Sequence, residues 1–474
     1  MTISASDKRP QDSWMQCEWL DEPLLEFASG GKHVSPRSGI ARYGPGSYQT
    51  ARHPDVVRIA FIGPGDAIEQ AEKWLSSIAD GVRGTDKTPE FPGWQPDRGF
   101  FSRLDFSPTW NEVLSQNELR AALGHDRKKA KFDAIRDLLD DKLRLIAQRD
   151  RRPDVVVIPL PDDLVRAVGS WLSPAKGIDS FRDLRRATKG AAMRWGLPTQ
   201  FLRASTVEGR DSTPMSRIAW NICTGLYTKA GGFPWSPLGL TPDTCYVGVG
   251  FFRPLDAGAR MQTSLAQAFD EHGEGLVLRG PDFEWDDVRM GTKSPHLSGE
   301  QAELLMTTAL DRYQQVMKRT PARVVVHKTS RYWPEESEGF RAGAERVSRR
   351  LDMLALGRQS RVRLLPLSKY PPLRGTRFTI GDLDFLYTTG FVPALNEFHG
   401  MHVPAPLEVA DHVGQDSGRE HLLREVLSLT KLNWNSSQLG GSLPITIRFS
   451  QLVGQILRET PDDVDPLPQF KFYM

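Results

Sequence analysis

Continuous apolar stretches alternate with amphipathic ones along the first half of the chain. VVRIAFIGPG (56–65) and DVVVIPLP (154–161) have the length and composition of buried strands, and KFDAIRDLLDDKLRLIAQR (131–149) between them has helical periodicity. A helix at 184–196 and a strand at 197–205 continue the alternation. Strands that are apolar on both faces and separated by helices form parallel sheets covered on both sides. The sequence therefore predicts an α/β fold whose first half is a Rossmann-like, doubly wound domain.

A segment rich in Gly and Pro, GGFPWSPLGLTPDT (231–244), marks a boundary near the middle of the 474 residues. Beyond it we expect strands at 244–252 and 275–280, a helix at 298–319 and a strand at 322–328. An early meander followed by a helix and a parallel strand is the ribonuclease H order. A helix at 338–354 and strands at 361–368 and 383–390 complete the predicted second domain.

The distribution of charge favours a local site for a polyanion. The net charge of the whole chain is only +2, but residues 182–229 contain nine Lys or Arg and three acids. A basic patch on a nearly neutral protein indicates one anion-binding site rather than a generally adhesive surface. A solvated, Arg-rich helix is the alternative explanation of the same pattern.

Composition excludes several classes of protein. Cys17, Cys223 and Cys245 are too few and too scattered for a disulfide framework or a zinc site. The first fourteen residues lack the apolar core of a secretory signal, and we expect them to form a disordered tail. No apolar run approaches the roughly 18 residues of a membrane-spanning helix. We therefore expect a cytoplasmic protein with no membrane partner.

Four polar residues in the basic region are candidates for binding a phosphate. Arg185 and Lys189 are spaced i,i+4 on the predicted helix at 184–196 and point the same way. Gln200 follows the next turn, and Lys229 ends a later helix. Cationic and amide donors that converge from separate elements suit a phosphate dianion, because hydrogen bonds between charged groups are the strong ones. Spacing alone does not distinguish such a pocket from a solvated face.

The order of these four residues resembles the 5′-phosphate pocket of the MID domain of Argonaute proteins. Other segments extend the resemblance: NICTGLYTKAGGFPW (221–235) is similar to the MID–PIWI junction, and 385–409 and 431–454 are similar to PIWI segments. The resemblance implies an N-terminal segment packing on the core (1–50), a MID domain (51–235) and a ribonuclease H-like PIWI domain (236–474). Without recognisable N and PAZ domains, the chain resembles the short prokaryotic Argonautes.

The resemblance also implies a metal ion at the phosphate pocket. In the family, a divalent cation bridges the guide phosphates and the C-terminal carboxylate, a role that would fall here to Mg²⁺ and Met474. The chain ends in QFKFYM, and such an apolar end is typical of a terminus buried in the core. Many relatives carry Tyr or His where this chain has Arg185, which can contact a phosphate but cannot stack as Tyr does.

The predicted nuclease site lacks its acids. Cleavage by two metal ions needs several carboxylates around ions roughly 4 Å apart. Gly250 stands where active PIWI domains have the first Asp, and His327 and Lys328 stand where the second is expected. A Lys ammonium would repel Mg²⁺. We therefore expect no catalytic residues, and we expect His327, Lys328 and Arg331 to hold the backbone of a target or guide instead.

The resemblance implies a protein that binds a 5′-phosphorylated guide RNA and, through it, a complementary single-stranded DNA target. In the family, the catalytic activity belongs to a partner effector with an Argonaute-associated region fused to a sirtuin-like, TIR or nuclease domain, and it serves immunity against phages and plasmids.

Two enzymatic alternatives remain. One is a guided endonuclease whose metal site is rebuilt from acids such as Asp243, Glu274, Asp382 and Asp384. The other is an α/β enzyme for small phosphorylated molecules. Such an enzyme would need FIGPGDA (61–67) as its phosphate loop, but this segment lacks the glycine spacing and the Lys-Ser/Thr of a Walker motif.

Overall fold

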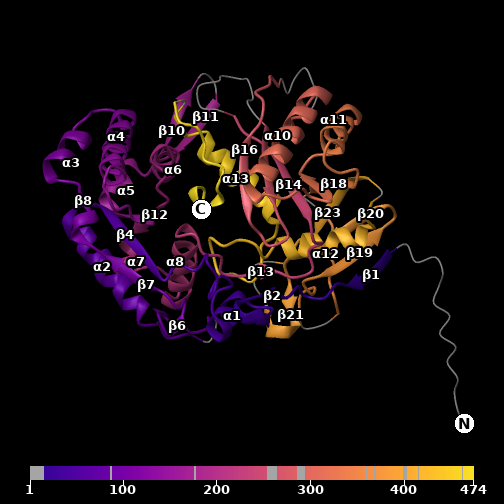
Figure 1. The fold of residues 1–474 in the computed structure, drawn as a ribbon, viewed down its shortest axis with the longest axis horizontal. Helices are drawn as coiled ribbons and strands as arrows, with labels where there is room; N and C mark the ends of the chain where they lie inside the picture. Colours follow the sequence, from indigo (N-terminus) through magenta and orange to yellow (C-terminus); the bar gives the residue numbers. More distant parts are fainter. Residues whose placement is uncertain are drawn as a thin grey trace, which may run out of the picture.

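The computed structural model describes residues 15–474 apart from 86–87, 176–177, 254–263, 286–293, 358–360, 368–369, 399–402, 415 and 462. Two sheets organise these residues, one in each half of the chain, and the C-terminus lies between them (Figure 1). The expected tail at 1–14 and part of the segment 385–409 lie outside the described residues.

The first sheet is parallel, as the sequence predicts. Its strand order is β12-β9-β4-β7, and β8 also pairs with β4. All six residues of β9 are buried, and successive side chains face opposite layers of helices. Helices α2 and α8 cover one face, and α4 and α6 cover the other. The strands are β4 (Val56–Gly63), β7 (Arg103–Phe106), β8 (Glu112–Val113), β9 (Val155–Leu160) and β12 (Thr199–Arg203). The covering helices are α2 (Gly65–Ala79), α4 (Lys128–Ala147), α6 (Leu184–Trp195) and α8 (Met215–Lys229).

The second sheet has the order β1-β19-β20-β23-β18-β17-β14-β15-β16 among the described residues. Strands β14, β15 and β16 form an antiparallel meander, and β17 lies parallel to β14 after the helix α10. This is the predicted ribonuclease H order. Helices α10 and α11 pack on one face, while α12 and α13 pack on the other. The strands are β1 (Met15–Trp19), β14 (Thr244–Phe251), β15 (Ser264–Phe269), β16 (Gly275–Arg279), β17 (Arg323–Lys328), β18 (Leu351–Gly357), β19 (Thr376–Ile380), β20 (Leu383–Leu386) and β23 (Leu407–Val413). The helices are α10 (Gly299–Met317), α11 (Pro334–Glu345), α12 (Arg419–Leu429) and α13 (Ile445–Leu457).

Shorter strands and helices connect these layers or lie at their edges. They are β2 (Leu25–Glu26), β3 (Lys32–His33), α1 (Pro36–Tyr43), β5 (Trp94–Gln95), β6 (Arg98–Gly99), α3 (Gln116–Leu123), α5 (Asp162–Val168), β10 (Ser170–Ala175), β11 (Ile178–Asp183), α7 (Ala204–Val207), β13 (Ser236–Pro237), β21 (Phe391–Val392) and β22 (Glu397–Phe398). Single 3-10 turns occupy Ala28–Gly30, Pro108–Trp110, Pro393–Leu395 and Phe470–Phe472. No helix in the described part of the chain is long and apolar enough to cross a membrane.

Two predicted elements of the second half are wrong. The helix expected at 338–354 ends at Glu345, and Leu351–Gly357 forms the buried strand β18. A short apolar run fits a buried strand and a buried helix equally well, and here the sheet determines its conformation. The strand expected at 361–368 joins no ladder over residues 361–367, although Val362 and Leu364 pack inward as in a strand.

The N-terminal segment contacts both halves rather than one. Strand β1 pairs with β19, β2 pairs with β13, and the Ser47 hydroxyl lies 2.7 Å from the Tyr227 hydroxyl on α8. Helix α6 of the first half also closely approaches the end of α13. A side chain at Gly190 would place its Cβ 2.7 Å from Thr460 Oγ1. The two sheets are thus joined around the C-terminus, where the candidate site lies.

Candidate anion-binding site

Helix α6 supplies two of the predicted phosphate ligands. The Asp183 side chain accepts a hydrogen bond from Arg186 N at 3.0 Å and caps the helix, and Gly196 ends it in the left-handed conformation. Arg185 lies at the exposed mouth of the site, and Lys189 lies one turn further in with only 5% of its surface exposed.

Three of the four predicted phosphate ligands meet the C-terminus in the interior. Lys189 Nζ donates to the Thr199 carbonyl at 2.9 Å and to the backbone oxygen of Met474. Lys229 Nζ, at the end of α8, donates to Gln200 Oε1 at 2.6 Å. The Gln200 amide nitrogen donates to the Phe201 carbonyl at 2.9 Å. The structure therefore brings Lys189, Gln200, Lys229 and Met474 together from four separate segments.

The site brings the basic groups of Arg185, Lys189 and Lys229 together, and burial disfavours the charged form of each. Lys229 is fully buried, and burial together with the charge of Arg185 lowers its pKa to about 7. Burial and the charges of Lys229 and Arg185 lower the pKa of Lys189 well below its ordinary value. Desolvation also lowers the pKa of Arg185, although Asp183 opposes the shift. Among the described residues, no carboxylate side chain forms an ion pair with either lysine.

The structure adds two residues that the sequence did not single out. A Cβ atom at Gly225 on α8 would lie 3.6 Å from Lys229 Nζ, 3.7 Å from Asn435 Oδ1 and 3.9 Å from Gln200 Oε1. Gly225 therefore leaves room beside the lysine, and Asn435 lines the same space. Both residues belong to segments noted for their resemblance, 221–235 and 431–454, but nothing in their spacing indicated a shared site.

The C-terminal residues pack as expected. Phe470, Phe472, Tyr473 and Met474 are all buried, and the Tyr473 hydroxyl donates to the Leu467 carbonyl at 2.9 Å. Gln469 forms a β-bridge to Leu276 on β16. These contacts fix Met474 beside Lys189.

The prediction that His327 and Lys328 line an open channel requires correction. Both are 1% exposed. Lys328 forms an ion pair with the buried carboxylate of Glu336, and His327 Nδ1 lies 2.9 Å from Thr446 Oγ1 on α13. Burial lowers the pKa of His327 to about 4, so this ring is neutral. In this conformation neither side chain can contact a nucleic-acid backbone, whereas Arg331 is exposed.

Gly250 lies on β14, where this strand packs against helix α13. A side chain at this position would place its Cβ 2.7 Å from Ser450 Cβ and 3.0 Å from Ser450 Oγ. Helix α13 therefore occupies the space that an Asp at this position would need.

Three of the acids considered for a rebuilt metal site form ion pairs with different arginines. Asp384 pairs with Arg377 and Arg419 at 2.9 and 3.0 Å, and Glu274 pairs with Arg52. Asp243 lies 3.8 Å from Arg319. Within the described ranges, no group of three or more His, Cys, Asp or Glu side chains could hold a metal ion.

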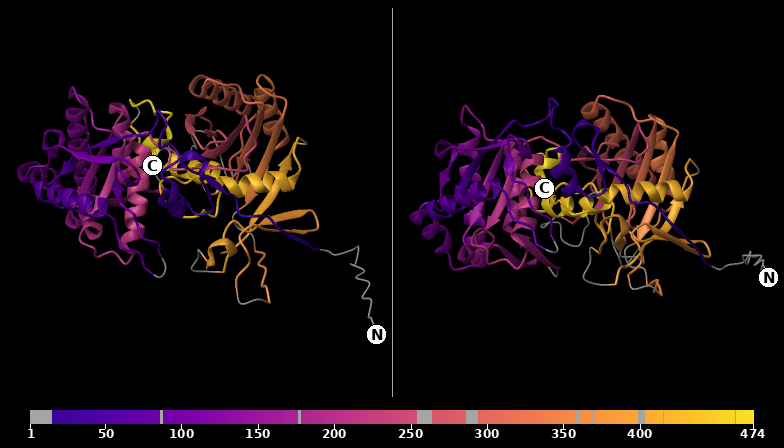
Figure 2. Two further views of the ribbon diagram at one scale, coloured as in Figure 1. Left: turned by 60° about the horizontal axis from the view of Figure 1, so that its bottom comes forward. Right: turned by 90° about the horizontal axis from the view of Figure 1, so that it is seen from below.

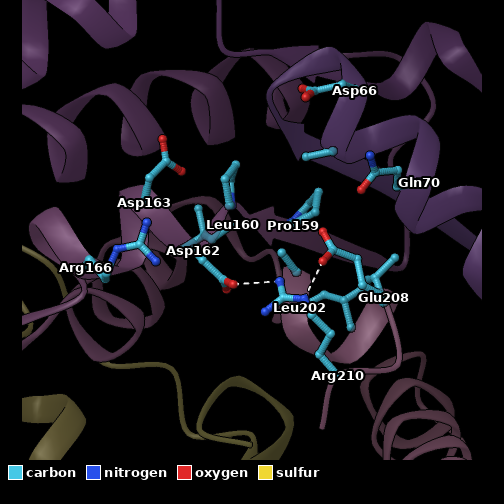
Figure 3. A pocket seen from close by; sticks show the side chains of 14 residues that line it. Asp66, Gln70, Pro159, Leu160, Asp162, Asp163, Arg166, Leu202, Glu208 and Arg210 are labelled. Atoms are coloured by element: carbon cyan, nitrogen blue, oxygen red, sulfur yellow. Dashed lines mark hydrogen bonds and ion pairs between the residues drawn. The ribbon is translucent and has the colours of Figure 1, made fainter.

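A second hollow, of about 370 Å³, lies outside the carboxyl ends of β4, β9 and β12, where α/β enzymes bind their ligands (Figure 3). It contains the loop FIGPGDA of the small-molecule hypothesis. Four acids and two arginines line it, and Arg210 is already paired with Asp162 at 2.7 Å and with Glu208 at 2.5 Å. An acidic lining disfavours phosphate, so this hollow does not support that hypothesis. The acids are Asp66, Asp162, Asp163 and Glu208.

The known proteins that this chain resembles were found by comparing structures, not sequences. The sequence matches no family model and no curated protein. The fold matches Clostridium butyricum Argonaute bound to a guide DNA and a 19-mer target DNA, with a TM-score of 0.68 and 14% identity over 95% of this chain and 54% of that one. It matches Aa-Ago with externally bound siRNA (TM-score 0.59, 16% identity, 96% of this chain and 56% of that one). A. aeolicus Argonaute gives a TM-score of 0.57 and 17% identity over 95% and 54%.

The chain spans about half the length of these Argonautes. At such low identity the likeness establishes the fold, and it agrees with the order of the two sheets and the ribonuclease H-like meander. The chain therefore has the MID–PIWI architecture of Argonaute proteins.

Proposed function

We propose that this chain is a catalytically inactive, short Argonaute that recognises nucleic acid through a bound guide. Its anion-binding site would hold the 5′-phosphate of a guide RNA, and the guide would select a complementary single-stranded DNA by base pairing. The RNA and DNA assignments derive from the resemblance to short prokaryotic Argonautes.

The observation that carries this proposal is the pair of buried lysines, of which Lys229 has no carboxylate partner among the described contacts and Lys189 meets none but the terminal oxygen of Met474. An unpaired buried ammonium is unfavourable in the free protein, because desolvation is not compensated. A phosphate dianion between Lys189 and Lys229 would supply the missing charge. The lining provides cationic and amide donors, which form strong charge-assisted hydrogen bonds with phosphate.

The first nucleotide would lie next to this phosphate. A hollow of about 140 Å³ opens beside Arg185, and Phe201 and Arg203 are among the residues that line it. Aromatic rings and guanidinium planes stack on nucleobases without strict preference for one base.

Guide affinity should decrease as the pH rises from 7 to 9. Lys229 loses its proton above about pH 7 in the free protein and must regain it to bind phosphate. Binding then takes up a proton, and affinity falls by up to roughly tenfold per pH unit. The phosphate itself is already a dianion in this range, because its second pKa is about 6.

Fluorescence-anisotropy titrations of wild type and Lys229→Met over this pH range test the predicted fall in guide affinity. The wild-type affinity should fall more steeply with pH than that of the variant, in which Lys189 is the one buried lysine of the site left to take up a proton; equal slopes would contradict the assignment of Lys229.

A Mg²⁺ ion fits the site in part. Met474 would hold the ion through its terminal carboxylate, but Lys189 already contacts an oxygen of that group. The ion would neutralise the part of the negative phosphate charge that the two lysines do not balance. We expect EDTA to weaken binding of a 5′-phosphorylated guide by about tenfold and to leave a 5′-hydroxyl guide unaffected, as measured by filter binding. An EDTA-insensitive affinity would mean that Lys189 suffices without metal.

We further propose that the response to a target belongs to a partner. The effector would carry an Argonaute-associated region fused to a sirtuin-like NADase domain, with a TIR or nuclease domain as the other possibilities. The complex would serve defence against plasmids and phages. Co-expression with the adjacent open reading frame, followed by an NAD⁺ consumption assay with and without guide and target, tests this assignment.

The guided endonuclease is the second candidate. It would need carboxylates that converge on a metal ion. Because Asp243, Glu274 and Asp384 are each paired with an arginine, the inactive form is favoured. Incubation of purified protein with guide, matched target and Mg²⁺ or Mn²⁺ separates the two. We expect the target to be retained on the protein and to remain intact on a denaturing gel, whereas a guide-dependent product would support the endonuclease.

A further inference from the structure

A row of side chains along helix α8 leads away from the anion-binding site. Its four positions are spaced i,i+4 and therefore lie along one slanted line on the helix surface. They are Arg217, Asn221, Gly225 and Lys229. From Lys229 to Arg217 the row covers about 18 Å of helix axis, because an α-helix rises about 1.5 Å per residue. The row thus begins at the proposed phosphate site and ends well outside it.

Residues 435–437 of the second half lie beside this row. Asn435 is next to Gly225, where the helix leaves space. Ser437, one helical turn further along, is 1% exposed and donates two hydrogen bonds to Asn221 Oδ1, from its backbone nitrogen at 3.0 Å and from its hydroxyl at 3.2 Å. Among the described contacts the Asn221 amide nitrogen has no acceptor, so it is available as a donor along the row.

Helix α1 adds an arginine at the far end of the row. Arg37 Nε donates to Ser437 Oγ at 2.9 Å, across 400 positions of sequence. The N-terminal segment that carries this arginine, in indigo, lies between the two halves of the molecule (Figure 2). Arg37, Asn221 and Ser437 therefore join three separate segments at one point.

The two arginines at this end lie close enough for their charges to repel. Burial and the charge of Arg217 lower the pKa of Arg37 to about 10, and the charge of Glu397 opposes this shift. Arg217 donates to the Thr88 hydroxyl at 3.4 Å. Within the described ranges, no carboxylate lies at ion-pair distance from either guanidinium. The protein therefore gathers two positive charges here without a direct counter-ion.

The chemistry of this group suits a backbone phosphate. Guanidinium groups present planar forks of N–H donors that match two phosphate oxygens at once. Arg37 and Arg217 are both half-buried, so a ligand can reach them, while the partial loss of water strengthens their attraction for an anion. Because Arg37 is held by Ser437, less side-chain freedom remains to be lost on binding.

We propose that Arg37 and Arg217 form a second anion subsite, which holds an internal backbone phosphate of the guide within its first few nucleotides. The inference rests on the proposed function, because the strand that begins at Lys229 supplies this phosphate. Asn221 and Ser437 act as positioning residues, and the row along α8 gives the strand its course. A contact of this kind adds affinity and fixes the path of the strand without reading its sequence.

Neutralising one guide linkage at a time locates the phosphate. The probe is a 5′-phosphorylated guide RNA in which a single methylphosphonate linkage is moved along the strand, and affinity is measured by fluorescence anisotropy. For the wild-type protein we expect a loss of about tenfold at one or two adjacent internal linkages, as for a lost charge-assisted hydrogen bond. In the double variant Arg37→Gln, Arg217→Gln, neutralising the same linkages should change nothing further, because the charges that attract them are gone.

Salt dependence gives a second readout. The double variant should bind the unmodified guide about tenfold more weakly, and the slope of log affinity against log salt should become shallower by roughly one. Its preference for a 5′-phosphate over a 5′-hydroxyl should stay as in wild type, because Lys189, Gln200 and Lys229 are unchanged.

Two further variants control for charge and folding. Arg341→Gln with Arg346→Gln removes two exposed charges at α11, on the face of the second sheet opposite α13, and should alter neither affinity nor slope. Arg217→Gln alone gives up only the 3.4 Å contact with Thr88 among the described side-chain contacts, so it should fold normally and show part of the loss. Urea unfolding confirms that each variant is folded.

Three results would overturn the inference while leaving the first site intact: wild-type affinity and salt slope in the double variant, a linkage scan with no sensitive internal position, or sensitive positions that persist in the double variant. If only methylphosphonates in the target strand discriminate wild type from the variant, the arginines hold the target, and the assignment to the guide fails. Failure of the proposed function would appear separately, as equal wild-type affinity for 5′-phosphate and 5′-hydroxyl guides.

Discussion

Lys229→Met is expected to weaken binding of a 5′-phosphorylated guide roughly ten- to hundredfold without lowering the stability of the free protein. The lysine is fully buried, has a pKa of about 7 and hydrogen-bonds only to Gln200 Oε1 among the contacts described. Removing it should cost about 1.5–3 kcal/mol of guide binding, the usual value of a charge-assisted hydrogen bond. Removing an unpaired buried charge should leave the free energy of unfolding unchanged or higher. Anisotropy titration and urea unfolding measure the two quantities.

Gly225 offers a control that keeps every charge in place. Gly225→Ala adds a Cβ at ordinary contact distance and should bind guide normally, with a stability gain near 1 kcal/mol from helix propensity. Gly225→Leu should fill the space beside Lys229 and weaken binding as much as Lys229→Met does. Normal binding by Gly225→Leu would show that the phosphate lies elsewhere, even if Lys229 matters for stability.

The second large effect is expected from restoring acids to the nuclease positions. Gly250→Asp together with Lys328→Asp should destabilise the fold by about 4–8 kcal/mol and should yield little or no cleavage. Asp at 250 collides with Ser450 on α13, and overpacking of this kind costs about 1–3 kcal/mol. Asp at 328 removes the partner of the buried Glu336 carboxylate, and breaking a buried pair costs about 3–5 kcal/mol.

Urea unfolding and a target-cleavage assay with Mg²⁺ check this prediction. Lys328→Met with Glu336→Leu is the control, because replacing a buried ion pair by apolar groups is often neutral. If the double Asp variant is as stable as wild type and cuts its target, the site is an intact nuclease site lacking only its acids, and the account of Gly250 and Lys328 fails.

The fold was predictable where burial dominates the sequence pattern. Strand β9 is apolar at every position, so its place inside a parallel sheet followed directly. The pattern failed at Leu351–Gly357, where a helix was expected, because an apolar run carries no period of its own. It failed again at 361–367, where residues alternate as in a strand but are not part of a described strand.

The candidate site was predictable only in part. The convergence of Lys189, Gln200 and Lys229 came from resemblance, because contacts between residues up to 285 positions apart, such as Lys189 and Met474, have no local signal. His327 and Lys328 were expected to contact a nucleic-acid backbone because, in the resemblance, they stand where a nuclease acid is expected. Lys328 is instead balanced by Glu336, which lies in the first turn of the next helix. Partners of this kind cannot be identified before the packing of that helix is known.

The central claim is that the buried lysines hold the 5′-phosphate of a guide. The most direct test compares two guide RNAs of the same sequence, one with a 5′-phosphate and one with a 5′-hydroxyl, by competition for the purified protein at pH 7. The account predicts at least tenfold tighter binding of the phosphorylated guide, and a loss of this preference in Lys229→Met. Equal affinity of the two guides for the wild-type protein would contradict it.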